Sequence, residues 1–310
     1  MISPSPLHII IGLIFNKKNQ ILIARRPQHT HLGGYWEFPG GKVKSGKIKT
    51  NETHNQALAR ELKEEVGIEV KASQFFMTIP HHYSDRSVIL HCYKVTDYQG
   101  EAFGCEDQQV RWCNMNELNC EDFPAANRSI INALRLPPFY VITETPSFLK
   151  RGQGELNYSF LQFRAPHLSQ DNYRKAAEQF LVQLKPEQTL LVNSDIEFAQ
   201  AHSQVGLHLN SRTLMHCEER PIPFSQWLAA SCHNLEELKH AEKIQVDFVT
   251  LSPVCLTATH PDAEALGWQK FHELIQQTSL PVYALGGVNK KDLAQAQQLG
   301  AVGISGISAF

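Results

Sequence analysis

The sequence of 310 residues has little excess of either charge and no long apolar run. Its formal net charge of −2 at pH 7 gives no electrostatic footprint for nucleic acid or an anionic membrane. The apolar stretch near the N-terminus, in MISPSPLHIIIGLIF, follows no positive charge and is too short to span a bilayer. We therefore expect a buried strand there, and neither a membrane nor a nucleic acid as a direct partner.

Cysteine pairs are also lacking. The seven cysteines include no C-x-x-C motif, and an odd number at irregular spacing predicts reduced thiols in a cytoplasmic protein. The 15 histidines are scattered and do not have the spacing of metal ligands. There is no internal repeat and no low-complexity segment. The length predicts two domains, since one core usually serves ~100–200 residues.

The clearest feature that the sequence does contain is a predicted helix with well-defined ends. Thr53 followed by Gln56 forms a capping box, and Gly67 is placed to end the helix in a left-handed conformation. An apolar stripe recurs every four residues, at Leu58, Leu62 and Val66. Strands are predicted on either side of this helix, at His8–Phe15, Gln20–Ala24, Phe75–Pro80, Val88–Thr96 and Val110–Asn114, and a short helix ends near Leu136. The segment NKKNQ indicates a hairpin turn between the first two strands.

Three glutamates share one face of the predicted helix. Glu61, Glu64 and Glu65 are spaced i, i+3 and i+4, so their like charges repel. A divalent cation such as Mg²⁺ would remove the conflict, because it takes oxygen ligands and bridges carboxylates to substrate phosphates. The alternative is a solvated acidic face with no further role.

The residues around these glutamates resemble the Nudix box, G-x5-E-x7-R-E-U-x-E-E-x-G-U, where U is aliphatic. The part from Glu52 to Ile68 fits throughout. Ten residues separate Gly41 from Glu52 where the pattern has five, which places about five extra residues, KIKTN, in the loop before the helix. The Gly40–Gly41 pair allows the backbone to approach a metal–phosphate group closely.

Further motifs make residues 7–136 similar to the MutT-type 8-oxo-dGTP diphosphatases: ARR, EFPGGK, YSDR and DFPxAN occur in that order. The resemblance implies a Nudix domain at 1–136, an α/β/α sandwich with a mixed sheet. It also implies Mg²⁺-dependent (or Mn²⁺-dependent) conversion of 8-oxo-dGTP to 8-oxo-dGMP and pyrophosphate, which would keep the nucleotide pool free of a mutagen. The nucleotide contacts so implied are Arg26, His31, Glu37, Phe38, Pro39, Gly40 and Asn127. The metal ligands so implied are the Gly40 carbonyl, Glu61, Glu64, Glu65 and Glu106.

Individual roles follow from the same resemblance. A carboxylate that does not bind metal can act as general base, and Glu61 is the candidate. Arg60 is expected to pair with Glu52 and brace the loop against the helix. Asn127 would recognise the oxidised base, because its amide offers both a donor and an acceptor. The alternative for Asn127 is a helix N-cap.

The second half is predicted to begin at Pro137–Pro138 and to fold as a (β/α)₈ barrel. Eight apolar runs predict its strands, at Phe139–Thr143, Phe160–Arg164, Thr189–Asn193, Gly206–Leu209, Trp227–Ser231, Phe248–Ser252, Val282–Leu285 and Val302–Ser305. Helices are predicted between them at Asp171–Leu184, Leu235–Ile244, Trp268–Thr278 and Lys291–Leu299. About 174 residues, 137–310, are few for this fold, so some helices must be trimmed.

This half resembles the thiamine-phosphate synthase/TenI family in the motifs YVITE, LQFRA, LLVNSD, GLHL, ALGGV and GISGISAF. The resemblance implies a phosphate site after strands seven and eight, formed by Gly286, Gly287, Ile307 and Ser308. It implies further substrate contacts at Gln162, Arg164, Asn193, Ser231, Thr257 and Thr259. The ligand would be a phosphorylated thiazole or thiamine compound.

The departures from this family bear on activity. Ser194 and Thr213 replace its two metal-binding aspartates, and Pro166 and His260 replace basic residues. Without carboxylates a Mg²⁺–pyrophosphate is poorly held, so we do not expect synthase activity. Pro253 stands where TenI-type enzymes have a histidine. Two alternatives to the leading hypothesis remain: the Nudix domain hydrolyses thiamine-pathway diphosphates or their toxic analogues, or the barrel is a ligand-sensing or scaffold module.

Overall fold

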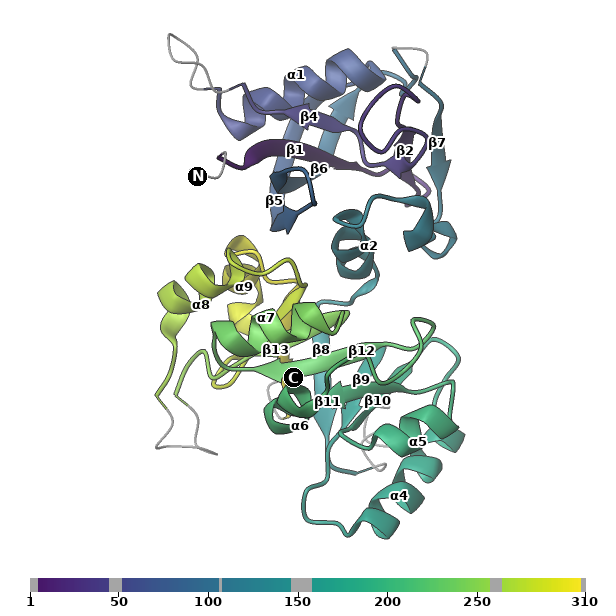
Figure 1. Cartoon of the computed structure of the whole chain (residues 1–310), viewed down its shortest axis with the longest axis vertical. Helices are drawn as coiled ribbons and strands as arrows, with labels where there is room; N and C mark the ends of the chain where they lie inside the picture. The colour runs from purple at the N-terminus through teal and green to yellow at the C-terminus, as the bar shows by residue number, and fades with distance from the viewer. Residues whose placement is uncertain (1–4, 45–51, 106–107, 146–157, 257–263, 308–310) are drawn as a thin grey trace. The chain divides into compact units, whose positions relative to one another are not determined.

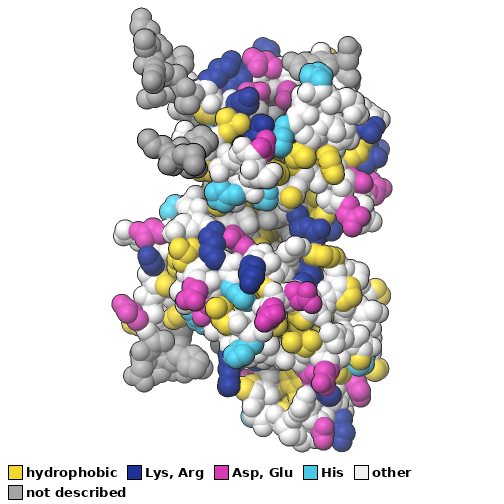
Figure 2. Space-filling model, viewed as in Figure 1, with side chains coloured by type: hydrophobic (Ala, Val, Ile, Leu, Met, Phe, Trp, Pro, Cys, Tyr) yellow, Lys and Arg dark blue, Asp and Glu magenta, His cyan; other side chains and the backbone are white. Residues whose placement is uncertain are grey.

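A computed structural model describes residues 5–44, 52–105, 108–145, 158–256 and 264–307. The chain divides into two compact units, Met1–Arg135 and Leu136–Phe310. The division lies one residue from the boundary expected between 136 and 137. On the face drawn in Figure 2, side chains of both charges are interspersed over each unit. Within the described ranges, no helix is long and apolar enough to cross a membrane.

The N-terminal unit is built on a four-stranded sheet in the order β4-β1-β6-β5 (Figure 1). These strands are β1 (Leu7–Ile14), β4 (Gly40–Lys42), β5 (Glu69–His82) and β6 (Ser87–Gln99). β1 runs parallel to β6, whereas the pairs β1–β4 and β5–β6 are antiparallel. The mixed sheet predicted for this unit is therefore confirmed. A second, antiparallel sheet consists of β3 (Trp36–Glu37), β2 (Ile21–Arg25) and β7 (Val110–Cys113).

Helix α1 (His54–Val66) lies over the first sheet and contacts β1, β4 and β5. Thr53 and Gln56 form the predicted capping box, and Gly67 ends the helix with a φ of 71°. The predicted apolar stripe is buried between helix and sheet, at Leu58, Leu62 and Val66. Both ends of α1 are thus confirmed. Two 3₁₀ turns, Met115–Glu117 and Cys120–Asp122, and helix α2 (Asn127–Arg135) complete the unit.

The hairpin predicted between the first two strands is almost absent. The turn itself forms, since Asn16 N–H donates to the Gln20 carbonyl at 3.0 Å, but Phe15 and Ile21 make the only bridge recorded between β1 and β2. Beyond that bridge the two strands enter different sheets. β1 pairs with β6 along its whole length, and on its other edge residues 9–11 pair with β4, so that part of the edge is not open to β2.

The C-terminal unit is a closed parallel barrel in the order β10-β11-β12-β13-β14-β15-β8-β9, which confirms the predicted fold. Its strands are β8 (Phe139–Thr143), β9 (Phe160–Phe163), β10 (Thr189–Asn193), β11 (Gly206–Leu209), β12 (Leu228–Cys232), β13 (Phe248–Leu251), β14 (Val282–Leu285) and β15 (Gly303–Gly306). Its helices are α4 (Gln170–Gln183), α5 (Ile196–Ala201), α6 (Ser211–His216), α7 (Leu235–Lys243), α8 (Gly267–Ile275) and α9 (Leu293–Gln298), with a 3₁₀ turn at Lys290–Asp292. The short helices α5 and α6, which sequence reasoning missed, are the trimmed connections that the length requires.

Candidate active site

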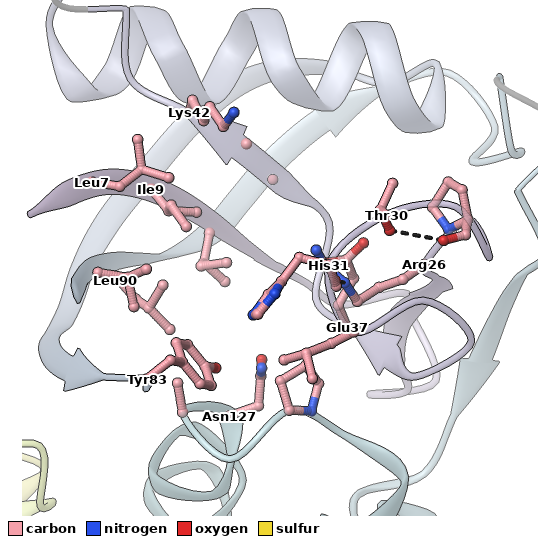
Figure 3. Close-up of a pocket in the computed structure, with 18 of the residues that line it drawn as sticks. Leu7, Ile9, Arg26, Thr30, His31, Glu37, Lys42, Tyr83, Leu90 and Asn127 are labelled. Carbon is pink, nitrogen blue, oxygen red and sulfur yellow. Dashed lines mark hydrogen bonds and ion pairs between the residues drawn. The ribbon is translucent and has the colours of Figure 1, made fainter. Parts of the chain in front are cut away.

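A cavity of about 520 Å³ opens in the N-terminal unit (Figure 3). One wall is aliphatic and comes from β1 and β6, with Leu7, Ile9 and Leu90 among its side chains. Polar side chains face it from the loop before β3, from the turn between β5 and β6, and from the start of α2. Such a cavity, apolar on one side with a few placed polar groups on the other, suits a small ligand with a flat apolar part.

The glycine turn of β4 lies at one end of this cavity, against the acidic face of α1. Gly40 has a φ of 154°, and a side chain there would collide with the Ile10 carbonyl. A side chain at Gly41 would collide with the Glu61 carboxylate. The Gly40 N–H donates to Glu65 Oε2 at 2.9 Å. Glycine at position 40 therefore allows the turn to lie close to β1, and the Gly40 hydrogen bond places Glu65 at the wall of the cavity.

Arg60 organises the other acidic side chains. Its guanidinium donates to both oxygens of Glu52, at 2.7 and 2.9 Å, in the pairing predicted from the sequence. The same group donates to Glu61 at 2.6 Å and to Glu64 at 3.1 Å. The hydrogen bonds from Arg60 lower the pKa of the Glu52 carboxyl to about 2. Glu52, which lies just before α1, is therefore tied to the helix through one guanidinium.

The oxygen donors proposed as metal ligands are only partly assembled. Carboxylates of Glu61, Glu64 and Glu65 and a backbone carbonyl at Gly40 suit a hard divalent cation such as Mg²⁺. However, in the described part of the chain no three acidic, histidine or cysteine side chains are placed to hold a metal ion. Glu61 and Glu64 turn toward Arg60 instead. The remaining predicted ligand, Glu106, lies outside the described residues.

Two of the predicted nucleotide contacts form an ion pair in the cavity wall. Arg26 Nη1 donates to Glu37 Oε2, and Arg26 Nε donates to the His31 carbonyl at 2.9 Å. Burial raises the pKa of the Glu37 carboxyl, and the charge of Arg26 opposes this rise. The guanidinium is therefore held in one orientation along the wall. Held in this way, it is preorganised for an anionic ligand.

Phe38 and Pro39 lie behind the cavity and are not among its lining residues. Phe38 is fully buried, and its ring packs on Phe123 with centroids 5.5 Å apart. The Pro39 carbonyl accepts a hydrogen bond from Gly12 N–H at 2.8 Å. In this structure both residues support the wall that Glu37 and Gly40 form.

Asn127 is buried and lies across the cavity from Lys42, the residue that follows the Gly40–Gly41 turn (Figure 3). Within the described ranges, neither its Oδ1 nor His31 Nε2 has a hydrogen-bond partner, and both atoms are buried. A buried polar atom without a partner costs about 1–3 kcal/mol, which a ligand in the cavity would recover. Asn127 is the first residue of α2, and its Oδ1 makes no capping bond. The geometry therefore favours ligand recognition over the N-cap alternative.

Sequence reasoning assigned no role to six further polar residues that line the cavity: His29, Thr30, Lys42, Tyr83, Arg86 and Gln108. Tyr83 and Arg86 belong to the YSDR motif at the turn between β5 and β6, where Tyr83 N–H donates to the Arg86 carbonyl at 2.8 Å. The Tyr83 ring contacts the ring of His31 edge-on at 5.5 Å. The motif was the available indication for these two residues. Gln108 carried none, since it follows the loop GEAFGCED without any periodic pattern.

In the barrel, the predicted phosphate site is described only in part. Gly286 and Gly287 follow β14 with φ values of 90° and 66°, and a side chain at Gly287 would collide with the Leu256 carbonyl. Ile307 is exposed just after β15. Ser308 lies outside the described residues, as do Thr257, Thr259 and His260. The glycine turn is thus present, without a complete view of the groups around it.

Polar side chains at the carboxyl ends of the barrel strands bond mainly to one another. Gln162 Nε2 donates to Asn193 Oδ1 at 3.0 Å, and His208 Nε2 lies 2.8 Å from Ser231 Oγ. Burial lowers the pKa of His208 to about 3, so its imidazole is neutral near pH 7. Among the described residues, Ser305 Oγ is buried without a partner.

Ser194 and Thr213, at positions where the resemblance implies metal-binding aspartates, are also engaged locally. Ser194 Oγ accepts a hydrogen bond from Asn210 N–H at 2.9 Å. Thr213 N–H donates to Asn210 Oδ1 at 2.9 Å, inside the N-cap of α6. The neighbouring carboxylate, Asp195, is held by Arg174 through two hydrogen bonds of 2.7 Å. Asp195 therefore does not replace the missing ligands.

Comparison with known proteins agrees with both halves. The NUDIX domain family matches residues 10–133, and the thiamine monophosphate synthase (TMP-TENI) family matches residues 147–310. The chain is 39% identical over 129 residues to the 8-oxo-dGTP diphosphatase of Escherichia coli (strain K12), which covers 42% of this chain and 96% of that protein. It is 44% identical over 120 residues to the 8-oxo-dGTP diphosphatase of Proteus vulgaris, covering 39% and 99%.

The barrel has relatives of its own. Over 189 residues the chain is 31% identical to the putative thiamine-phosphate synthase 2 of Aquifex aeolicus (strain VF5), covering 57% of this chain and 99% of that protein. The predicted fusion of two families is confirmed. With a Nudix fold and its acidic helix in one unit and a closed parallel barrel in the other, the chain belongs to the Nudix hydrolases in its N-terminal half and to the thiamine monophosphate synthase family in its C-terminal half.

Proposed function

We propose that the N-terminal unit hydrolyses oxidised purine nucleoside triphosphates, converting 8-oxo-dGTP to 8-oxo-dGMP and pyrophosphate with Mg²⁺, and so protects the cytoplasmic nucleotide pool. One observation carries the proposal. Glu65 and the Gly40 turn lie at one end of a single cavity, and Asn127 lies at the other. The amide oxygen of Asn127 has no hydrogen-bond partner among the described residues. The similarity to the 8-oxo-dGTP diphosphatases of Escherichia coli and Proteus vulgaris supports the proposal.

The chemistry assigns a task to each end. A triphosphate is polyanionic, and Mg²⁺, held by Glu61, Glu64 and Glu65, would neutralise charge that develops on the phosphoryl oxygens. The glycine turn lets the phosphate chain approach the backbone. Glu61 is proposed to take a proton from the attacking water through a carboxylate oxygen that does not bind the metal. At the far end, the base packs on the aliphatic wall while the Asn127 amide recognises its polar edge.

The barrel is proposed to bind a phosphate monoester without synthase activity. The Gly286–Gly287 turn supplies backbone N–H groups for one phosphate. Release of pyrophosphate from a pyrimidine substrate needs a cation held by carboxylates, and Ser194 and Thr213 supply none. The alternative, a purely structural or regulatory barrel, predicts no binding of such ligands.

A substrate panel tests the proposal. The full chain with Mg²⁺ is assayed on 8-oxo-dGTP, dGTP, thiamine diphosphate and a pyrimidine diphosphate, with pyrophosphate and phosphate measured separately. We expect pyrophosphate from 8-oxo-dGTP with a kcat/KM at least about 10-fold above that for dGTP. The reason is that the wrong base leaves polar groups of the site without hydrogen-bond partners. The fused barrel favours one other candidate, a hydrolase of thiamine-pathway diphosphates. Phosphate release from those compounds alone would establish that candidate instead.

A further inference from the structure

Gln108 is a cavity residue whose buried oxygen has no hydrogen-bond partner. Its side-chain Oε1 is inaccessible to solvent and unpartnered among the residues that the structure describes, and Gln108 lines the same cavity as Glu65 and Gly40. A buried carbonyl oxygen without a donor is destabilising by about 1–3 kcal/mol. Such an atom at the wall of a ligand cavity indicates a donor that arrives with the ligand.

Hydrogen bonds hold the backbone on both sides of Gln108. The Cys105 N–H donates to the Glu65 carbonyl at 2.9 Å, so the preceding segment is anchored to the last turn of α1. On the other side, the Gln109 carbonyl accepts from Arg25 N–H at 2.8 Å. A side chain at Gly104 would collide with the Gln108 carbonyl, so these two residues lie close together. The two hydrogen bonds tie residues on either side of Gln108 to α1 and β2, and Gln108 lines the same cavity as Glu65.

The chemistry of the hydrolytic end selects the donor. The phosphate groups there are acceptors, and a carbonyl oxygen would repel them rather than bind them. The attacking water is a donor that every hydrolysis in this cavity must bring. Glutamine is suited to hold such a water, as it does in other phosphoryl-transfer enzymes.

We propose that Gln108 positions the attacking water by accepting a hydrogen bond from it through Oε1. In the step, the water oxygen bonds to phosphorus while the P–O bond to the leaving group breaks. One water proton passes to a carboxylate base, and the leaving group departs with the electron pair of the broken bond. The other hydrogen stays on the new P–O–H group and is the one donated to Gln108. The inference rests on the proposed hydrolase activity, but it does not depend on which base is recognised.

The test compares Gln108→Met, Gln108→Glu and Gln109→Met in the full chain. Methionine has a similar length but no strong acceptor, whereas glutamate keeps an acceptor oxygen. The adjacent Gln109 is exposed and is the matched control. We expect Gln108→Met to lower kcat about 10- to 100-fold with KM within about 3-fold, since placing the nucleophile acts mainly in the transition state. Gln108→Glu should keep kcat within about 10-fold of the wild type, and Gln109→Met should change neither constant.

The ratio of kcat/KM for 8-oxo-dGTP and dGTP separates this role from base recognition. We expect Gln108→Met to leave that ratio unchanged. A changed ratio would assign Gln108 to the base, and a kcat equal to that of Gln109→Met would remove it from the reaction; either result overturns the proposal. If the wild type cleaves only thiamine-pathway diphosphates, the proposed function fails, and the same variants tested on those substrates still decide the role of Gln108.

Discussion

Gly40 N–H and Glu65 Oε2 are 2.9 Å apart, and this one hydrogen bond joins the glycine turn to the acidic face of α1. It places Glu65 at the cavity wall, whereas Glu61 and Glu64 face Arg60. Of the three glutamates Glu61, Glu64 and Glu65, Glu65 is therefore the one that lines the cavity. The Gly40 hydrogen bond also allows the structural role of Glu65 to be separated from a metal-binding role.

Glu65→Gln should lower hydrolysis by about 100-fold or more, because a neutral amide is a weak ligand for a hard cation. The amide oxygen still accepts the Gly40 N–H, so the fold should be retained. Steady-state kinetics over a range of Mg²⁺ and Mn²⁺ concentrations measures the effect. Glu69→Gln, at an exposed position in β5, is the control and should match the wild type. Activity of Glu65→Gln within a few-fold of the wild type would refute the metal-site assignment.

Asn127→Ala should reduce the preference for 8-oxo-dGTP over dGTP more than it slows hydrolysis of the oxidised nucleotide. The reason is that the Asn127 amide hydrogen-bonds to the polar edge of the oxidised base, whereas with the unmodified base polar groups remain without partners. The kcat/KM of both nucleotides is measured in wild type and variant. An unchanged ratio would mean that the Asn127 Oδ1, which has no hydrogen-bond partner among the described residues, does not recognise the base.

Arg60→Lys should destabilise the N-terminal unit by about 1–3 kcal/mol. Lysine keeps the charge but cannot donate in a fork to both oxygens of Glu52 while also reaching Glu61. Urea unfolding followed by tryptophan fluorescence gives the free energy of unfolding. Glu52→Gln should lower it too, and the two changes together should be less than additive. Additive effects would show that the Arg60–Glu52 contact does not brace the loop.

The stability of the N-terminal unit should fall between pH 6.5 and pH 4 because of a histidine cluster. His8 Nδ1 lies 2.9 Å from His91 Nε2, and the His54 ring is 4.1 Å from the His91 ring. Burial, followed by the charges of His54 and His8, lowers the pKa of His91 to about 4. The folded state therefore keeps His91 neutral where the unfolded chain binds a proton, so stability is full above pH 6.5 and is lost as the pH falls through 4.

Unfolding experiments at a series of pH values check this expectation. His91→Asn should flatten the dependence between pH 6.5 and 4, while the exposed His29→Asn should leave it as in the wild type. An identical slope in wild type and His91→Asn would contradict the linkage.

The barrel should bind a phosphate monoester and fail to make thiamine phosphate. Isothermal titration of the full chain with thiazole phosphate or thiamine phosphate tests binding, and a coupled assay tests synthesis. Gly287→Ala should abolish binding, because its Cβ would collide with the Leu256 carbonyl. Sustained synthase turnover would overturn the argument from Ser194 and Thr213. Absence of binding to every phosphate ligand would leave the barrel as a structural module.

The sequence predicted the elements whose ends are set locally. Thr53 and Gly67 fixed α1 to the residue, and β8 and β10 matched their apolar runs because parallel barrel strands are buried on both faces. The short strands β3 and β4 were missed, since two or three residues carry no periodic pattern and depend on neighbours distant in sequence. The site was predicted only where motifs carried it. Gln108 could not be predicted, because only the folded chain brings it to the cavity wall.

The sequence also predicted only part of the set of glutamates that Arg60 contacts. The pairing with Glu52 was predicted, but the contacts to Glu61 and Glu64 were not. The carboxylates of Glu52, Glu61 and Glu64 are all near enough in sequence to reach the Arg60 guanidinium. Only the folded structure decides which of them it contacts. The same contacts explain why the proposed metal ligands do not converge as they stand.

The most direct test of the central claim is the steady-state hydrolysis of 8-oxo-dGTP and dGTP by the full chain with Mg²⁺, with both products identified. We predict 8-oxo-dGMP and pyrophosphate in equal amounts, a kcat/KM at least about 10-fold higher for the oxidised nucleotide, and loss of turnover when the cation is chelated. Equal rates for the two nucleotides, or turnover that survives chelation, would contradict the account.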